Sequence, residues 1–119
     1  MGDRELLELA AKASGYEFDL PMLGGGPALA IDGMHILGLR LAGGAIWNPL
    51  TDDGDALRLA VKLDLHVQCD FKEEESKVYV YGGWVGNGIE EELGELDKFA
   101  ATRRAIVRAA AEIGKAGAQ

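Results

Sequence analysis

The side chains of this chain that are best suited to hold a ligand are arginines and aromatic rings. Guanidinium groups bind phosphates and carboxylates through several N–H donors, and aromatic rings stack on nucleobases. Residue types of both kinds occur near the middle and near the carboxyl end of the sequence. The candidate ligand-binding residues are Trp47, Asn48, Trp84, Arg103, Arg104 and Arg108. Arginine among them could reach an anionic ligand, and the aromatic rings could stack on a base.

Arg103 has two interpretations. It falls on the same helical face as Phe99 and Ile106, and a cation at the edge of a core needs a partner. Asp53 or Asp55 could pair with it, which would make it structural, or it could reach an anionic ligand in a cleft. The chain contains many carboxylates, so the structural pair is the favoured interpretation.

The aromatic and glycine-rich segments also have alternatives. Trp84 follows an expected strand between glycines and is the best candidate for stacking, although core filling is the commoner role of any single ring. Gly24 to Gly26 and Gly82 to Gly88 could present amides to a phosphate. Neither stretch has the Lys-Ser/Thr ending of a P-loop or the strand and helix context of GxGxxG, so a loop and a hairpin turn are expected.

Catalytic and metal sites find little support in the sequence. His35 and His66 are isolated, and Cys69 alternates to the opposite strand face from His66, so no metal-binding triad is spaced here. Ser14 and Ser76 lack a nucleophile-elbow motif. The carboxylates gather at turns and helix starts, where solvent keeps their acidity ordinary. We expect a non-enzyme without metal or cofactor.

The composition predicts one soluble domain spanning residues 1–119. Twelve basic and 20 acidic residues give a net charge of −8, which opposes direct binding to nucleic acid. Cys69 is the only cysteine, so no intramolecular disulfide can form and a reducing cytoplasm is expected. No secretion signal and no apolar run near ~18 residues is visible, so no membrane association is expected.

The segment from Trp47 to Leu63, WNPLTDDGDALRLAVKL, contains a clear helix start. Pro49 keeps the preceding residue extended, so the helix begins after it. Thr51 or Asp52 can cap the helix, and Asp55 is placed to reach back toward the cap. An EF-hand calcium loop would need alternating oxygen ligands over twelve residues, a spacing that is missing here.

Helical spacing predicts which side chains these helices bury. The apolar stripe of the segment after Asp52 contains Leu57, Ala60 and Val61, and its opposite face is charged. A last helix from about Asp97 to Ile113 should bury one face and expose another. The buried face would contain Phe99, Ile106, Ala110 and Ile113, the exposed face Arg104, Arg108, Glu112 and Lys115, with Gly114 and Gly117 ending the helix.

Other patterns complete an α+β fold. Asp3 to Ser14 predicts a helix that ends at Gly15. Asp32-Gly33 predicts a hairpin turn between Ala28 to Ile31 and Met34 to Leu37. Three strands should follow the second helix. The first is a half-buried strand from Leu65 to Phe71, with Leu65, Val67, Cys69 and Phe71 on one face; Val78 to Tyr81 and a strand near Ile89 and Glu90 come next. We expect a largely antiparallel sheet covered by about three helices, in α-β-α layers.

Three segments resemble the phage ABA sandwich domain, a family of small phage and prophage proteins. They are LLELAAKASGYE from Leu6, WNPLTDDGDALRLAVKL from Trp47 and ATRRAIVRAAAEIG from Ala101. The resemblance implies an α-β-α layered fold, a phage or prophage origin and no established catalytic residue. It leads to the expectation of an accessory protein in the host cytoplasm that sequesters a nucleotide-derived immune signal.

Two alternative functions and an assembly state accompany that expectation. An acidic protein–protein interaction module, or an inhibitor of a host protein, would use its charged surface or an exposed edge strand. An enzyme that degrades the same signals is the weakest alternative. We expect a homodimer or higher homo-oligomer, in which the strand from Val78 to Tyr81 could extend a sheet between copies.

Overall fold

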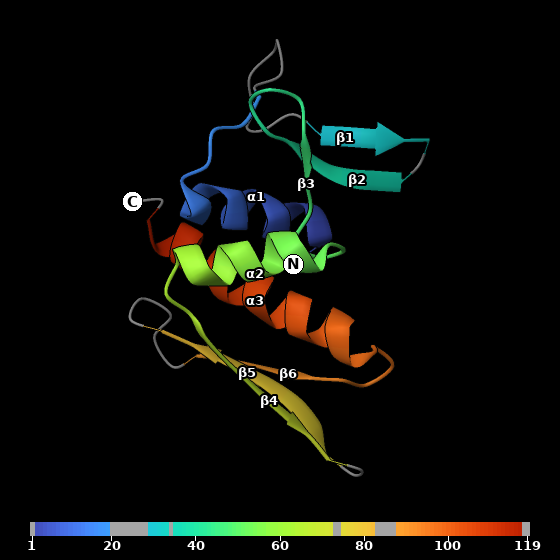
Figure 1. Cartoon of the computed structure of the whole chain (residues 1–119), viewed down its shortest axis with the longest axis vertical. Coiled ribbons are helices and arrows are strands. Elements are labelled where there is room, and N and C mark those ends of the chain that lie inside the picture. The colour runs from blue at the N-terminus through green and yellow to red at the C-terminus, as the bar shows by residue number, and fades with distance from the viewer. Residues whose placement is uncertain (1, 20–28, 34, 73–74, 83–87, 118–119) are drawn as a thin grey trace.

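The computed structural model describes residues 2–19, 29–33, 35–72, 75–82 and 88–117. Within them the chain forms three helices and six strands (Figure 1). In chain order these are α1 (Asp3–Ser14), β1 (Leu29–Asp32), β2 (His35–Arg40), β3 (Ile46–Trp47), α2 (Asp53–Lys62), β4 (His66–Phe71), β5 (Ser76–Tyr81), β6 (Ile89–Glu92) and α3 (Lys98–Ala116). The predicted α+β class is confirmed.

The described strands form two antiparallel sheets, in the orders β1-β2-β3 and β4-β5-β6. The helices lie between the two sheets, with α3 against β4 to β6 and α1 against β2 (Figure 1). The segment directly after β3 separates the two sheets. Pro49 prevents the strand from continuing, and α2 begins at Asp53, so the chain crosses the helical layer before it forms β4.

The predicted hairpin is confirmed at β1 and β2. Leu29 pairs with Leu39 and Asp32 pairs with His35, with a register shift between Ala30 and Ile31. Gly33 supplies the turn with a φ of 61°, in the left-handed region that glycine adopts without strain. The hairpin lies beyond α1, on the side away from β4 to β6 (Figure 1).

The start of α2 is fixed by Asp52, which is the N-cap rather than Thr51. Its carboxylate accepts a hydrogen bond from the Asp55 amide at 2.8 Å. The Asp55 carboxylate reaches back beyond the cap and accepts from the Asn48 amide at 2.9 Å. Asn48 in turn donates its side-chain amide to the Leu37 carbonyl at 3.0 Å. This chain of hydrogen bonds fastens the start of α2 to β2.

The buried stripe of α2 differs from the predicted one. Ala56, Leu59 and Ala60 are buried, whereas Leu57 and Val61 are 64% and 68% exposed. The prediction was therefore right for Ala60 and wrong for Leu57 and Val61. Both stripes have helical spacing, and they differ by a rotation of roughly 100°, one residue of an α-helix. Packing against α3 selects the stripe with the two small alanines.

The faces of α3 also depart from prediction, because this helix has partners on several sides. Phe99 is 66% exposed, although Ile106 and Ala110 are buried as predicted. The predicted solvent face is wrong for Arg104 and Arg108, which lie over β6 and are only partly exposed. Five of the eight buried residues of α3 are alanine, and such small side chains let neighbouring elements approach closely.

Gly114 does not end α3, contrary to prediction. The helix continues through it to Ala116, and Gly117 is the C-cap. A Cβ atom built at Gly114 would collide with the carbonyl oxygen of Leu9 in α1. Glycine is therefore required here by the close crossing of α1 and α3.

The predicted strand from Val78 to Tyr81 lies within β5, the central strand of its sheet. β4 and β6 flank it on both sides, so it cannot extend the sheet to a second copy, and that part of the prediction is wrong. Val78 and Val80 are buried toward α3, and Tyr79 and Tyr81 alternate to the opposite face.

Within the described part of the chain, every helix is too short or too polar to cross a membrane.

The close crossing of α1 and α3 makes a prediction at Gly114. Gly114→Ala should lower the free energy of unfolding by about 1–3 kcal/mol, because overpacking outweighs the higher helix propensity of alanine. Urea unfolding measures the change. Gly117→Ala is the matched control: its Cβ would meet the Ile113 carbonyl oxygen at an ordinary 3.5 Å, and it should change stability by less than about 0.5 kcal/mol. Equal free energies of unfolding for the two variants would contradict the close crossing of α1 and α3.

Candidate functional site

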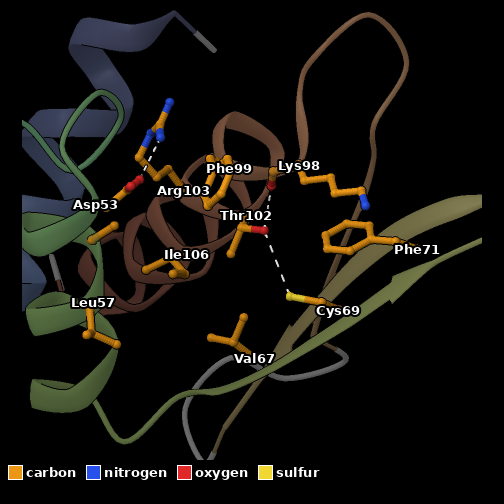
Figure 2. Close-up of a pocket in the computed structure, with 11 residues that line it drawn as sticks. Asp53, Leu57, Val67, Cys69, Phe71, Lys98, Phe99, Thr102, Arg103 and Ile106 are labelled. Atoms are coloured by element: carbon orange, nitrogen blue, oxygen red, sulfur yellow. Dashed lines mark hydrogen bonds and ion pairs between the residues drawn. The ribbon is translucent and has the colours of Figure 1, made fainter.

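An apolar groove lies between α2, the first half of α3 and β4 (Figure 2). It encloses about 440 Å³. Carbon atoms dominate its walls. It is lined by Asp53, Ala56, Leu57, Val67, Cys69, Phe71, Lys98, Phe99, Thr102, Arg103 and Ile106. We call this feature the β4 groove.

Alternation along β4 supplies one wall of the groove. Val67, Cys69 and Phe71 point toward α3, and Val67 remains 37% exposed (Figure 2). The predicted shared face is confirmed, but a half-buried strand should bury its apolar face, and Val67 and Cys69 on that face are exposed. Both side chains therefore face α3 across the groove without being buried.

The helical walls contain two of the residues whose burial was predicted wrongly. Leu57 of α2 and Phe99 of α3 both line the groove while remaining largely exposed. Soluble proteins rarely leave contiguous large apolar side chains uncovered unless the surface binds something. The exposed residues of α2, α3 and β4 thus converge on one surface.

Arg103 lies at the rim of the groove and has structural partners. Its Nη1 donates to the Asp53 carboxylate at 2.6 Å (Figure 2). Its Nε donates to the Leu50 carbonyl at 2.9 Å. The Arg103 side chain is 18% exposed. The favoured structural interpretation of Arg103 is therefore confirmed, with Asp53 as the carboxylate. This pair joins the start of α2 to α3.

The other polar groups of the groove also make contacts within the chain. Thr102 donates its hydroxyl to the Lys98 carbonyl at 2.7 Å, and the Cys69 sulfur lies 3.9 Å from the same hydroxyl. The Lys98 ammonium lies 5.2 Å from the centre of the Phe71 ring, within cation–π range. Because these polar groups already have partners within the chain, the groove surface is suited to apolar contact.

Arg104 and Arg108 lie on a different face, at a cavity of about 380 Å³. Arg104 contacts the Asp3 carboxylate at 3.1 Å and the Glu91 carboxylate at 3.4 Å. Arg108 contacts Glu91 at 3.4 Å and donates to the Glu90 carbonyl at 3.1 Å. Both arginines therefore tie α3 to β6, and one of them also ties α3 to α1.

The remaining candidates are placed apart from these arginines. Trp47 is buried in the core, where its ring meets those of Tyr16 and Phe18 edge to face at 6.2 and 5.3 Å. Asn48 is also buried and joins β2 to the start of α2 through its hydrogen bonds. Trp84 lies outside the described residues. The described candidates thus occupy a core position, a loop joint, the groove rim and the β6 cavity, rather than one site.

The glycine and histidine candidates add no ligand site to the described residues. Gly24 to Gly26 lie outside the description, as do most residues of the Gly82 to Gly88 stretch. His66 stacks on Tyr81 with ring centres 4.9 Å apart. Within the part of the chain that is described, histidine, cysteine, aspartate and glutamate form no group of three or more that could hold a metal ion.

Electrostatic effects on the outer face of the second sheet involve Lys77 and Glu90. Their side chains are 2.9 Å apart, and the hydrogen bond and charge of Lys77 lower the pKa of Glu90 below its ordinary value. Partial desolvation and then Glu90 raise the pKa of Tyr79. The Lys77–Glu90 ion pair joins β5 to β6 on the face opposite the β4 groove.

Sequence reasoning missed the β4 groove. The alternation of Val67, Cys69 and Phe71 was visible, and so was the spacing of Leu57 and Val61, but both patterns are typical of core residues. A usable signal was the presence of two competing apolar stripes on α2, because one helix packing on one partner can bury only one of them.

Comparisons of this chain with protein-family models, with curated proteins and with solved structures found no match.

The Arg103 contacts predict a stabilising role for this side chain. Arg103→Gln should lower the free energy of unfolding by about 1–3 kcal/mol, because the Leu50 carbonyl loses its donor and Asp53 loses its partner. Asp53→Asn keeps an acceptor at a largely exposed position and should change stability by less than about 1 kcal/mol. Denaturant unfolding compares the two. An Arg103→Gln variant as stable as the native chain would refute the structural role.

Proposed function

We propose that this protein is a non-enzymatic docking module that binds an extended segment of a second polypeptide chain in the β4 groove. The observation that carries the proposal is the convergence of Leu57, Val67 and Phe99, all exposed, on one apolar surface. This belongs to the interaction class that the sequence offered as its alternative function. The single cysteine favours action in the cytoplasm.

The position of β4 supports an extended occupant. β4 is an edge strand of the sheet β4-β5-β6, and it pairs with β5 residue for residue from His66 to Phe71. Edge strands are commonly protected by lysine, proline or a bulge. β4 contains neither residue type, and its register is unbroken. A segment that adds to this edge gains main-chain hydrogen bonds and places alternate side chains over the groove.

Charged side chains of both signs lie at the rim of the groove. Asp53 is 67% exposed at one end, and its carboxylate is already paired with Arg103. Lys98 also lines the groove. The rim therefore favours neither sign of charge, and the apolar walls indicate a segment with alternating apolar residues.

The polar groups around the groove support binding rather than catalysis. Thr102 and Arg103 both have hydrogen-bond partners within the chain, which position them structurally. A nucleophile or general base needs an aligned proton partner and a perturbed acidity. The groove supplies apolar area instead, which is the main source of affinity in peptide docking.

The docking proposal is tested with peptides selected by display against the native chain. Peptides that bind should contain alternating apolar residues, and Phe99→Asp should weaken their binding by about tenfold or more because it places a charge in the apolar wall. Fluorescence anisotropy measures the dissociation constants. Ile31→Asp is the matched control, since Ile31 is an exposed apolar residue of β1 in the other sheet. Equal binding by both variants would refute the groove as the site.

A second candidate function is the sequestration of a small nucleotide, and the cavity at Arg104 and Arg108 favours it. Two partly exposed guanidinium groups line this cavity, beside the apolar side chains of Leu6 and Ile89. Glu91 already contacts both arginines, so a phosphate would have to displace it. A sequestering role would suit the phage proteins that the sequence resembles.

Thermal-shift measurements against cyclic dinucleotides, cyclic trinucleotides and cyclic ADP-ribose isomers test this second function. A ligand at a hundredfold its dissociation constant should stabilise the chain by about 2.7 kcal/mol. Chromatography after denaturation should return the ligand intact. The double variant Arg104→Gln with Arg108→Gln should lose the shift, whereas Arg103→Gln should keep it. No shift across the panel would eliminate this candidate.

A further inference from the structure

The two edges of the sheet β4-β5-β6 differ, because β6 is protected against further pairing and β4 is open. At β6, Arg108 of α3 donates to the Glu90 carbonyl at 3.1 Å, and three consecutive glutamates crowd the strand. Like charges and a bound guanidinium protect β6 against pairing with another strand. β4 has no such protection in the described structure. Any strand that adds to this sheet should therefore add at β4.

The sequence of β4 is self-complementary in one antiparallel register. When Gln68 lies opposite Gln68 of a second copy, Val67 lies opposite Cys69 of that copy, and His66 lies opposite its Asp70. Directly opposed residues share a sheet face, so the apolar pair falls on the groove side. The imidazole and carboxylate meet on the opposite face, where a hydrogen bond or ion pair can form.

The same register brings exposed apolar residues of α2 together. A two-fold axis normal to the sheet keeps each face on its own side, so both copies place their helices over the same face of one continuous sheet. Leu57 of α2 lines the groove with Val67 of β4, and Val61 lies one helical turn after Leu57. Both α2 side chains are mostly exposed in the single chain. Two α2 helices can therefore cover each other's exposed stripe above the paired β4 strands.

We propose that the occupant of the β4 edge is a second copy of this chain, which forms a two-fold dimer through antiparallel pairing of β4 centred on Gln68. The inference rests on the proposed strand-docking function of the β4 groove and names its partner. Three observations carry it: the unprotected edge, the self-complementary register and the exposed Leu57 and Val61 beside it. The dimer covers the apolar surface that a single chain leaves exposed.

Sedimentation equilibrium of the full chain over a wide concentration range tests the dimer. The native protein should reach twice the mass of one chain, and Val67→Lys should weaken association by about tenfold or more, since lysine on an edge strand opposes pairing. Ile31→Lys is the matched control: it places the same charge on an exposed isoleucine of the edge strand β1 and should leave the dimer intact. Circular dichroism checks that each variant is folded.

A charge exchange tests the register. His66→Asp places a carboxylate opposite Asp70 of the second copy and should weaken the dimer. Adding Asp70→Lys to that variant restores opposite charges and should recover most of the association. A merely structural role of either residue would not produce this rescue. Equal weakening by the single and double variants would overturn the register centred on Gln68.

The outcomes separate this inference from the docking function on which it rests. A native chain that stays monomeric at every concentration, while selected peptides still bind the β4 groove, overturns the dimer and leaves the docking function standing. A dimer that is insensitive to Val67→Lys overturns the proposed interface. If substitutions in the groove change neither peptide binding nor dimerisation, both proposals are overturned.

Discussion

The close approach of α1 and α3 is the constraint on which the rest of the fold depends. At Gly114 the α3 backbone lies against the Leu9 carbonyl oxygen so closely that a single added methyl group would collide. The alanines on the buried faces of α3 keep its other neighbours near as well. A helix with such small side chains can serve as the centre of a fold, because several elements can reach it at once.

The packing of α1 and α2 on α3 leaves the first turn of α3 partly uncovered. α1 runs along the helix from Arg104, which contacts Asp3, to Gly114, which meets Leu9. α2 also packs on α3, and its buried residues are Ala56, Leu59 and Ala60. The first turn extends past both helices, and Phe99 remains exposed there. β4 approaches from the opposite side without closing over this turn. The β4 groove is thus the space that remains when short helices pack on a longer one.

Ionic contacts distinguish the structural faces of α3 from the groove. Arg103, Arg104 and Arg108 each contact carboxylates or carbonyl oxygens from another element, and together they join α3 to α1, the start of α2 and β6. Arginines in these positions hold elements together through several donors at once. The groove beside them is apolar by contrast, and its physical character suits the binding of protein segments more than the binding of a phosphate.

The sequence by itself determined the local structure. Pro49 and Asp52 set the start of α2, Asp32-Gly33 set the hairpin, alternation located β4 and β5, and excess carboxylates set the charge, because each depends on a few neighbouring residues. Only the tertiary structure decided which apolar stripe of α2 is covered, that the strands form two sheets, that Gly114 is a crossing point and that Phe99 stays exposed. Spacing identifies faces, but burial depends on the elements that arrive from distant parts of the chain. The ligand candidates Trp47 and Asn48 illustrate the difference, since residue type made them plausible for binding and tertiary packing placed both in the interior.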